Sequence, residues 1–133
     1  MIACRIDRER ESVFSPFPQA DGAAPSSSSS STPKTHYVVV REDLPIGVLA
    51  AHVAHAAGES GPAPPGSIAV VLGVPNEAEL LAIAARLEAR GVPFTLIREN
   101  AGQFDGQATA IGVVPTTDRK TVGKAVSSLR LVR

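Results

Sequence analysis

Two histidines, His52 and His55, stand three residues apart in a segment whose apolar periodicity predicts a helix. That spacing places both imidazoles on one helix face, while Leu49 and Val53 mark the stripe that faces the core. We therefore expect the histidines to point away from the core. Imidazole titrates near neutral pH, so the pair suits acid–base catalysis or the positioning of a ligand. An ordinary pair of solvated or interface histidines has the same spacing.

A metal site is another interpretation of the two histidines. It requires at least one more ligand, and the sequence offers Glu59, Asp105 or His36 from other elements. The one cysteine, Cys4, excludes a disulfide framework and a thiolate zinc site. The sequence also has no glycine-rich phosphate loop and no nucleophile elbow. We expect no bound metal and no cofactor.

The segment after a predicted strand at 94–98 is the other candidate for chemistry. Arg98, Glu99 and Asn100 lead into a glycine-containing loop. Polar groups at a strand end followed by such a loop are common at active sites, and they are also common in ordinary connections. Phe104, within this polar loop, either anchors the loop or stacks on a base or sugar.

Basic residues accumulate toward the C-terminal end, with no acidic residue after Asp118. One interpretation is a cationic helix end that complements the helix dipole. The other is contact with the phosphates of a nucleic-acid backbone. The sequence supports both equally. The residues concerned are Arg119, Lys120, Lys124, Arg130 and Arg133.

The composition bounds the class of protein. A chain of 133 residues is the length of one domain. Its 13 basic residues balance 13 acidic ones, so the net charge predicts no generic polyanion partner. Hydrophobic residues make up 44% and aromatic residues 4%, so the core must be aliphatic and alanine-rich. No apolar run approaches the ~20 residues of a membrane helix, and no signal peptide is evident. We expect a soluble, cytoplasmic protein with no membrane or DNA partner.

The composition changes near residue 35. Residues 1–35 contain four prolines, a run of six serines and few large apolar groups. Such a segment cannot bury enough surface to offset its chain entropy, so we predict a disordered tail. The acidic residues in it argue against an organelle transit peptide. The folded domain is then expected at 36–133.

Strand and helix patterns alternate along this domain and predict an α/β fold. Continuous apolar strands that alternate with helices imply a sheet covered on both faces, hence three layers. The short link between the third and fourth strands favours an antiparallel pair, so the sheet should be mixed. The expected strands are 36–41, 67–74, 94–98 and 107–113, with a short edge strand near 129–132, and the expected helices are 46–57, 76–90 and 116–127.

The motifs HYVVVREDL, GVLAAHVAHAA, IAVVLGVPNEAELL and LIREN…GQATAIGVVP occur in this order, before a basic C-terminus. This series resembles the peptidyl-tRNA hydrolase type 2 family, the archaeal and eukaryotic kind that also has divergent bacterial members. The resemblance covers about 37–133. It implies a small three-layer α/β domain with a mixed four-stranded sheet between helices, usually a homodimer.

The resemblance also implies hydrolysis of the ester that joins a peptide to the terminal ribose of tRNA. Val48 stands where the family's first helix carries lysine, and His52 stands where it carries glutamine, whereas His55 matches the family's histidine. Asn100 stands where the second signature carries aspartate. Thr109 lies in a segment similar to that of divergent bacterial members.

These matches define the expected site. His55 and His52 would position or activate water, with Asn100 as the third catalytic candidate and Glu99 or Asp105 as a further acidic group. Arg98, Lys120 and Lys124 are the candidates for tRNA phosphate contacts, and Thr109 is a candidate substrate contact. An RNA- or ligand-binding module without catalytic activity is the alternative on the same fold. A small-molecule or metal hydrolase that uses the histidines is a third.

Overall fold

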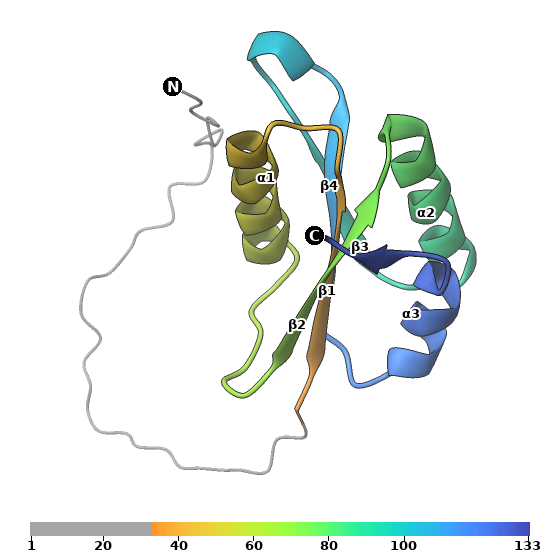
Figure 1. Ribbon diagram of the computed structural model, residues 1–133. Helices are drawn as coiled ribbons and strands as arrows, with labels where there is room; N and C mark the ends of the chain where they lie inside the picture. Colours follow the sequence, from red (N-terminus) through yellow and green to blue (C-terminus); the bar gives the residue numbers. More distant parts are fainter. Residues whose placement is uncertain (1–32) are drawn as a thin grey trace, which may run out of the picture.

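A computed structural model describes residues 33–133 of the chain (Figure 1). The predicted tail at 1–35 lies outside the described residues up to position 32, and position 35 already belongs to the first strand. No helix in the described part is long and apolar enough to cross a membrane.

The elements are β1 (Thr35–Arg41), α1 (Ile46–Glu59), β2 (Ile68–Val74), α2 (Glu77–Ala89), β3 (Phe94–Arg98), the short 3-10 helix η1 (Gly102–Phe104), β4 (Ala108–Val113), α3 (Arg119–Val126) and β5 (Arg130–Leu131).

The strands form one mixed sheet in the order β3-β4-β1-β2-β5. β1 and β2 are parallel, whereas β4 is antiparallel to both β1 and β3, which confirms the expected β3–β4 pair. The carboxyl ends of β1, β2 and β3 therefore meet the start of β4 at one edge of the sheet. The family resemblance implied four strands, but β5 pairs with Leu72 and Gly73 of β2 and adds a fifth. This fifth strand is the short edge strand expected near 129–132.

The helices cover the two faces of the sheet unequally. α1 packs on one face, and α2 and α3 pack together on the other (Figure 1). Successive residues of β1 alternate between the two cores: Val38 and Val40 join the cluster under α1, and Tyr37 and Val39 join the one under α2 and α3. This confirms the three-layer arrangement predicted from the sequence.

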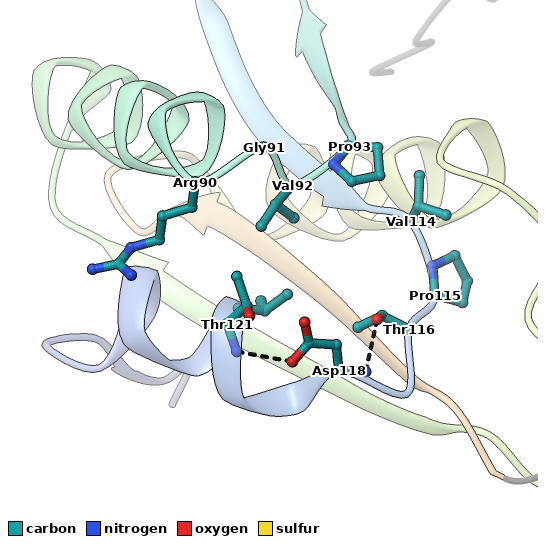
Figure 2. A pocket seen from close by; sticks show the side chains of 10 residues that line it. Arg90, Gly91, Val92, Pro93, Val114, Pro115, Thr116, Asp118 and Thr121 are labelled. Carbon is teal, nitrogen blue, oxygen red and sulfur yellow. Dashed lines mark hydrogen bonds between the residues drawn. The ribbon is translucent and has the colours of Figure 1, made fainter.

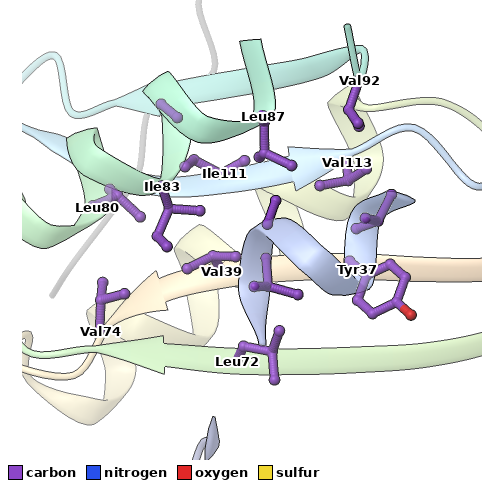
Figure 3. Packing of buried hydrophobic residues seen from close by; sticks show 14 of the residues in the cluster. Tyr37, Val39, Leu72, Val74, Leu80, Ile83, Leu87, Val92, Ile111 and Val113 are labelled. Carbon is purple, nitrogen blue, oxygen red and sulfur yellow. The ribbon is translucent and has the colours of Figure 1, made fainter. Parts of the chain in front are cut away.

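The larger core lies under α2 and α3 (Figure 3). The α2 stripe predicted from helical spacing is buried in full, and so is the inward face of α3. Asn76 begins α2 by accepting a hydrogen bond from the Glu79 amide at 3.0 Å, as expected for an N-cap. The residues are Leu80, Ile83, Ala84 and Leu87 on α2, and Val122, Ala125 and Val126 on α3.

The start of α3 differs from the prediction. Asp118, rather than Thr116 or Thr117, caps this helix by accepting a hydrogen bond from the Thr121 amide at 3.1 Å. The Thr116 hydroxyl instead accepts from the Asp118 amide at 2.9 Å, which fixes the turn before the helix (Figure 2). Hydrogen bonding from Thr121 lowers the pKa of the Asp118 carboxyl, and threonine would offer no charge at this position.

α1 lies very close to β4 at one point. A Cβ atom on Gly112 would collide with the carbonyl oxygen of Ala56, so only glycine allows the two backbones to approach this far. α1 also continues through Gly58, where we expected it to stop. Ser60 ends it by donating both its amide and its hydroxyl to the Ala56 carbonyl, and the buried His36 ring bonds the same hydroxyl at 2.7 Å.

Truncation of Leu80 tests the larger core. Leu80→Ala should lower the free energy of unfolding by about 2–5 kcal/mol, because the side chain is fully buried and its removal leaves a cavity. Leu81→Ala, at the next position and 37% exposed, is the control and should cost less than about 1 kcal/mol. Urea denaturation of both variants gives the two values. Equal losses would contradict the placement of α2.

His36 should make stability depend on pH. Burial lowers the pKa of its imidazole, so the unfolded chain takes up the proton first as the pH falls. The contribution of His36 to the free energy of unfolding is fully present above about pH 6.5. Below that pH it declines by at most about 1.4 kcal/mol per pH unit. His36→Gln, which keeps a hydrogen-bond donor but does not titrate, should flatten the unfolding free energy between about pH 6.5 and 5.5. An unchanged slope would show that His36 is not responsible.

Candidate functional site

His52 points into the protein, so its predicted outward orientation is wrong. The residue is 0% exposed, and its side chain lies with Val48, Leu49 and Ala56 on the inward side of α1. Positions 48, 52 and 56 are each four apart and therefore share a face. The sequence interpretation failed because it assigned the core face from the stripe through Val53, which is only half-buried.

Both ring nitrogens of His52 have partners on the neighbouring strands. Nε2 lies 3.1 Å from Oε2 of Glu99, and Nδ1 lies 2.8 Å from the hydroxyl oxygen of Thr109. Glu99 and Thr109 are themselves buried, and the Thr109 hydroxyl also lies 3.3 Å from the Ile97 carbonyl oxygen. Within residues 33–133 no buried side-chain nitrogen or oxygen lacks a hydrogen-bond partner. We call His52, Glu99 and Thr109 the buried triad.

A β-bulge turns Thr109 toward α1. Ile97 of β3 pairs with Ala110 of β4, whereas the next residue, Arg98, pairs with Ala108, so Thr109 is the extra residue on β4. The extra residue puts Thr109 on the same side as Ala110, which packs in the core under α1. Without the bulge, strict alternation would place the Thr109 hydroxyl on the α2 side, out of reach of His52.

Glu99 also anchors the loop that follows β3. Its second carboxylate oxygen, Oε1, accepts a hydrogen bond from the Asn100 amide at 2.9 Å. Its backbone closes the loop at the other end, since its amide donates to the Gln107 carbonyl and its carbonyl accepts from the Gly106 amide. The same carboxylate therefore holds His52 and fixes the start of the Asn100 loop. The alternative acidic candidate, Asp105, lies in the exposed part of this loop.

His55 is the histidine that reaches the surface. Its ring meets the His52 ring edge to face, with centroids 5.9 Å apart and planes at 68°, and it is half-buried. Asn100 and Arg98 are both exposed near this end of β3, and the Arg98 guanidinium donates to the Gly106 carbonyl at 3.1 Å. The contacts therefore run from His55 to His52, from His52 to Glu99 and from Glu99 to the Asn100 amide, and Arg98 precedes Glu99 in the chain.

Lys120 and Lys124 do not join this group. They lie on α3, on the face of the sheet opposite to α1. A hollow of about 280 Å³ lies beside α3, between the end of α2 and the segment after β4 (Figure 2). Arg90, Asp118 and Thr121 help to line it. The two lysines thus lie on a different layer of the domain from the histidines.

The metal interpretation finds no ligand set in the structure. Among residues 33–133 no group of three or more His, Cys, Asp or Glu side chains could hold a metal ion. Of the proposed additional ligands, His36 bonds Ser60, and Glu59 is exposed at the end of α1. The group that completes the histidine site is instead the Thr109 hydroxyl, which bonds His52. Its role depends on a one-residue bulge, and such a bulge leaves no signal in the sequence.

The bonds of the buried triad lead to a stability prediction. Thr109→Val preserves the shape of the side chain but removes the hydroxyl that bonds Nδ1 of His52, so a buried polar group loses its partner. The free energy of unfolding should fall by about 1–3 kcal/mol. Thr95→Val is the control, at a half-buried position on β3 whose hydroxyl has only a 3.5 Å contact. It should lower the free energy of unfolding by less than about 0.5 kcal/mol. Thermal or urea unfolding measures both, and a neutral Thr109→Val would show that the bond adds nothing.

Comparisons with known proteins give a family and a fold. A family model described as "Peptidyl-tRNA hydrolase PTH2" matches residues 64–132, just over half of the chain. This stretch contains Glu99, Asn100 and Thr109, and α1 with its two histidines precedes it. No curated protein matches the sequence.

A solved structure from Agrobacterium tumefaciens, of a protein of unknown function, is similar to this one. It has a TM-score of 0.53 and 17% sequence identity, and the alignment covers 77% of this chain and 100% of that chain. At this identity the likeness supports the fold alone. The family match, together with the mixed sheet and the loop after β3, identifies this chain as a member of the PTH2 peptidyl-tRNA hydrolase family.

Proposed function

We propose that the domain hydrolyses the ester bond of peptidyl-tRNA and releases peptide and free tRNA. Membership of the PTH2 family supports a hydrolase with a tRNA substrate. The observation that carries the proposal is the buried triad beneath His55. A buried, fully hydrogen-bonded histidine packs edge to face with a second histidine that reaches the surface. This combination suits the activation of water beside an ester.

His52 serves as a positioning residue in this proposal. Glu99 accepts a hydrogen bond from Nε2, and the Thr109 hydroxyl occupies Nδ1, so neither nitrogen is available to a water molecule without rearrangement. Two fixed hydrogen bonds prevent rotation of the ring. The ring in turn limits the positions open to His55.

His55 acts as the general base. Its imidazole takes a proton from water while the water oxygen forms a bond to the ester carbonyl carbon, which gives a tetrahedral intermediate. The Asn100 side-chain amide donates to the oxyanion that develops on the carbonyl oxygen. The intermediate then collapses, the bond to the ribose oxygen breaks, and that oxygen takes from His55 the proton that came from water. Asn100 replaces a family aspartate here, and an amide can donate where a carboxylate cannot.

Arg98 is the proposed phosphate contact nearest the site. It is exposed and follows Ile97 at the end of β3, directly before Glu99. Lys120 and Lys124, on the other layer, are proposed to contact a more distant part of the tRNA backbone. Thr109 is too deeply buried for the substrate contact that the sequence suggested, and we assign it to the support of His52. Assembly as a homodimer and a cytoplasmic location stay predictions.

Single-turnover cleavage of a peptidyl-tRNA tests the assignment of His55. His55→Ala should reduce the rate at least about tenfold, because removal of a general base typically costs about 10²–10⁴. Glu59→Gln, at an exposed position on the same helix, should leave the rate unchanged. Unfolding measurements on both variants separate a chemical effect from a loss of structure.

Two outcomes would contradict the proposal. An inactive wild-type domain that still binds tRNA in a salt-dependent way would indicate a binding module. Full activity in His55→Ala would remove this histidine from the chemistry and leave the loop after β3 as the source of the activity.

A further inference from the structure

Arg41 is a buried charge at the end of β1 that the proposed mechanism does not use. Its side chain is only 6% exposed, although arginine is seldom buried without a specific partner. It lies at the edge of the sheet where β1, β2 and β3 end and β4 begins. A cation placed there must be satisfied by groups from the neighbouring segments, and those groups show what it holds together.

One side of the guanidinium binds the turn between β1 and α1. Nε donates to Oδ1 of Asp43 at 2.9 Å, and Nη2 donates to Oδ2 of the same carboxylate at 2.8 Å. This bidentate pair fixes the plane of the guanidinium. It also raises the pKa of Arg41 and lowers the pKa of Asp43, so both groups stay charged.

The other side of the guanidinium binds the end of the loop at 99–107. Nη1 donates to the side-chain oxygen of Gln107 at 2.8 Å and to the carbonyl of Ala108 at 3.1 Å. The Phe104 ring, in η1 of the same loop, lies 5.9 Å from the guanidinium carbon. A cation over an aromatic face is attracted to it, so Arg41 contacts the loop at its middle and at its end.

The start of the loop is fixed by Glu99, which the buried triad already holds. Glu99 and Arg41 are thus the two anchors of a loop whose exposed part carries Asn100. Glu77 of α2 adds a third fixed point, since its carboxylate accepts a hydrogen bond from the Ala108 amide at 2.6 Å. The end that Arg41 holds is therefore connected both to the turn before α1, through Asp43, and to α2, through Glu77.

We infer that Arg41 is a positioning residue for the reaction: it fixes the loop at 99–107 in the shape that places Asn100 over the site. The effect of Arg41 on the reaction rests on the proposed function, whereas its hold on the loop at 99–107 rests on the contacts alone. Lysine cannot replace arginine here, because a single ammonium cannot bind Asp43 in a bidentate manner and also reach Gln107 and Ala108.

Two readouts on the full chain test this inference. Arg41→Lys should accelerate amide hydrogen exchange at 102–107 about tenfold, while exchange within α2 stays unchanged. In peptidyl-tRNA cleavage it should lower kcat about tenfold and change KM less than about twofold, because a misplaced oxyanion donor weakens the transition state rather than substrate binding. Arg90→Lys, the same substitution at an exposed position after α2, should change neither readout.

Gln107→Leu is a milder second variant, which keeps the Arg41–Asp43 pair and removes one loop acceptor. It should shift both readouts in the same direction by a smaller factor, and it serves if Arg41→Lys does not fold. Unchanged exchange at 102–107 in a folded variant overturns the inference, and so does faster exchange with kcat unchanged. An inactive wild type refutes the proposed function instead, and the exchange data alone then decide whether Arg41 holds the loop.

Discussion

The hydrogen bonds of the His52 ring are the constraint on which the site depends. A buried imidazole must have partners for both nitrogens, and here they come from two different strands, Glu99 after β3 and Thr109 on β4. Together they fix the rotation of α1 over the sheet, because His52 can meet both partners only in one orientation of the helix. The position of His55, one turn further along α1, follows from that orientation.

The sheet supplies this constraint through small local features. The bulge at Thr109 gives β4 an extra residue on the α1 side, and Gly112, three residues on, lets the α1 backbone approach to contact. Ser60 and His36 then hold the end of α1. The helix is thus fixed near its middle by the buried triad and at its end by a second hydrogen-bonded cluster, which suits a surface that must hold a reactive group in place.

The sequence predicted the fold well because the fold depends on long apolar patterns. The strand at 94–98 and the buried stripe of α2 were assigned correctly from periodicity and from the Asn76 cap. β5 was foreseen only as a possible edge strand, since two residues carry little pattern. The family resemblance could be seen in the sequence because it consists of these strand and helix motifs in a fixed order.

The site was harder to predict, because it depends on single residues. The burial of His52 could not be derived from its spacing to His55. A histidine can point toward solvent or toward the core, and it points toward the core when polar groups there can bond both ring nitrogens. The role of Thr109 depends on one extra residue in β4. That of Arg41 depends on Gln107 and Ala108, sixty-six and sixty-seven positions away along the chain. Such contacts arise only from the tertiary structure.

A double-mutant cycle on single-turnover peptidyl-tRNA cleavage tests the central claim, which is that the buried triad and His55 act as one unit. Glu99→Gln and His55→Ala would be measured singly and together, with folding verified for each. If the account is right, each single variant loses about tenfold or more, and the double variant loses little beyond the larger of the two, as residues that act together do. Losses that multiply, or a Glu99→Gln variant with full activity, would contradict it.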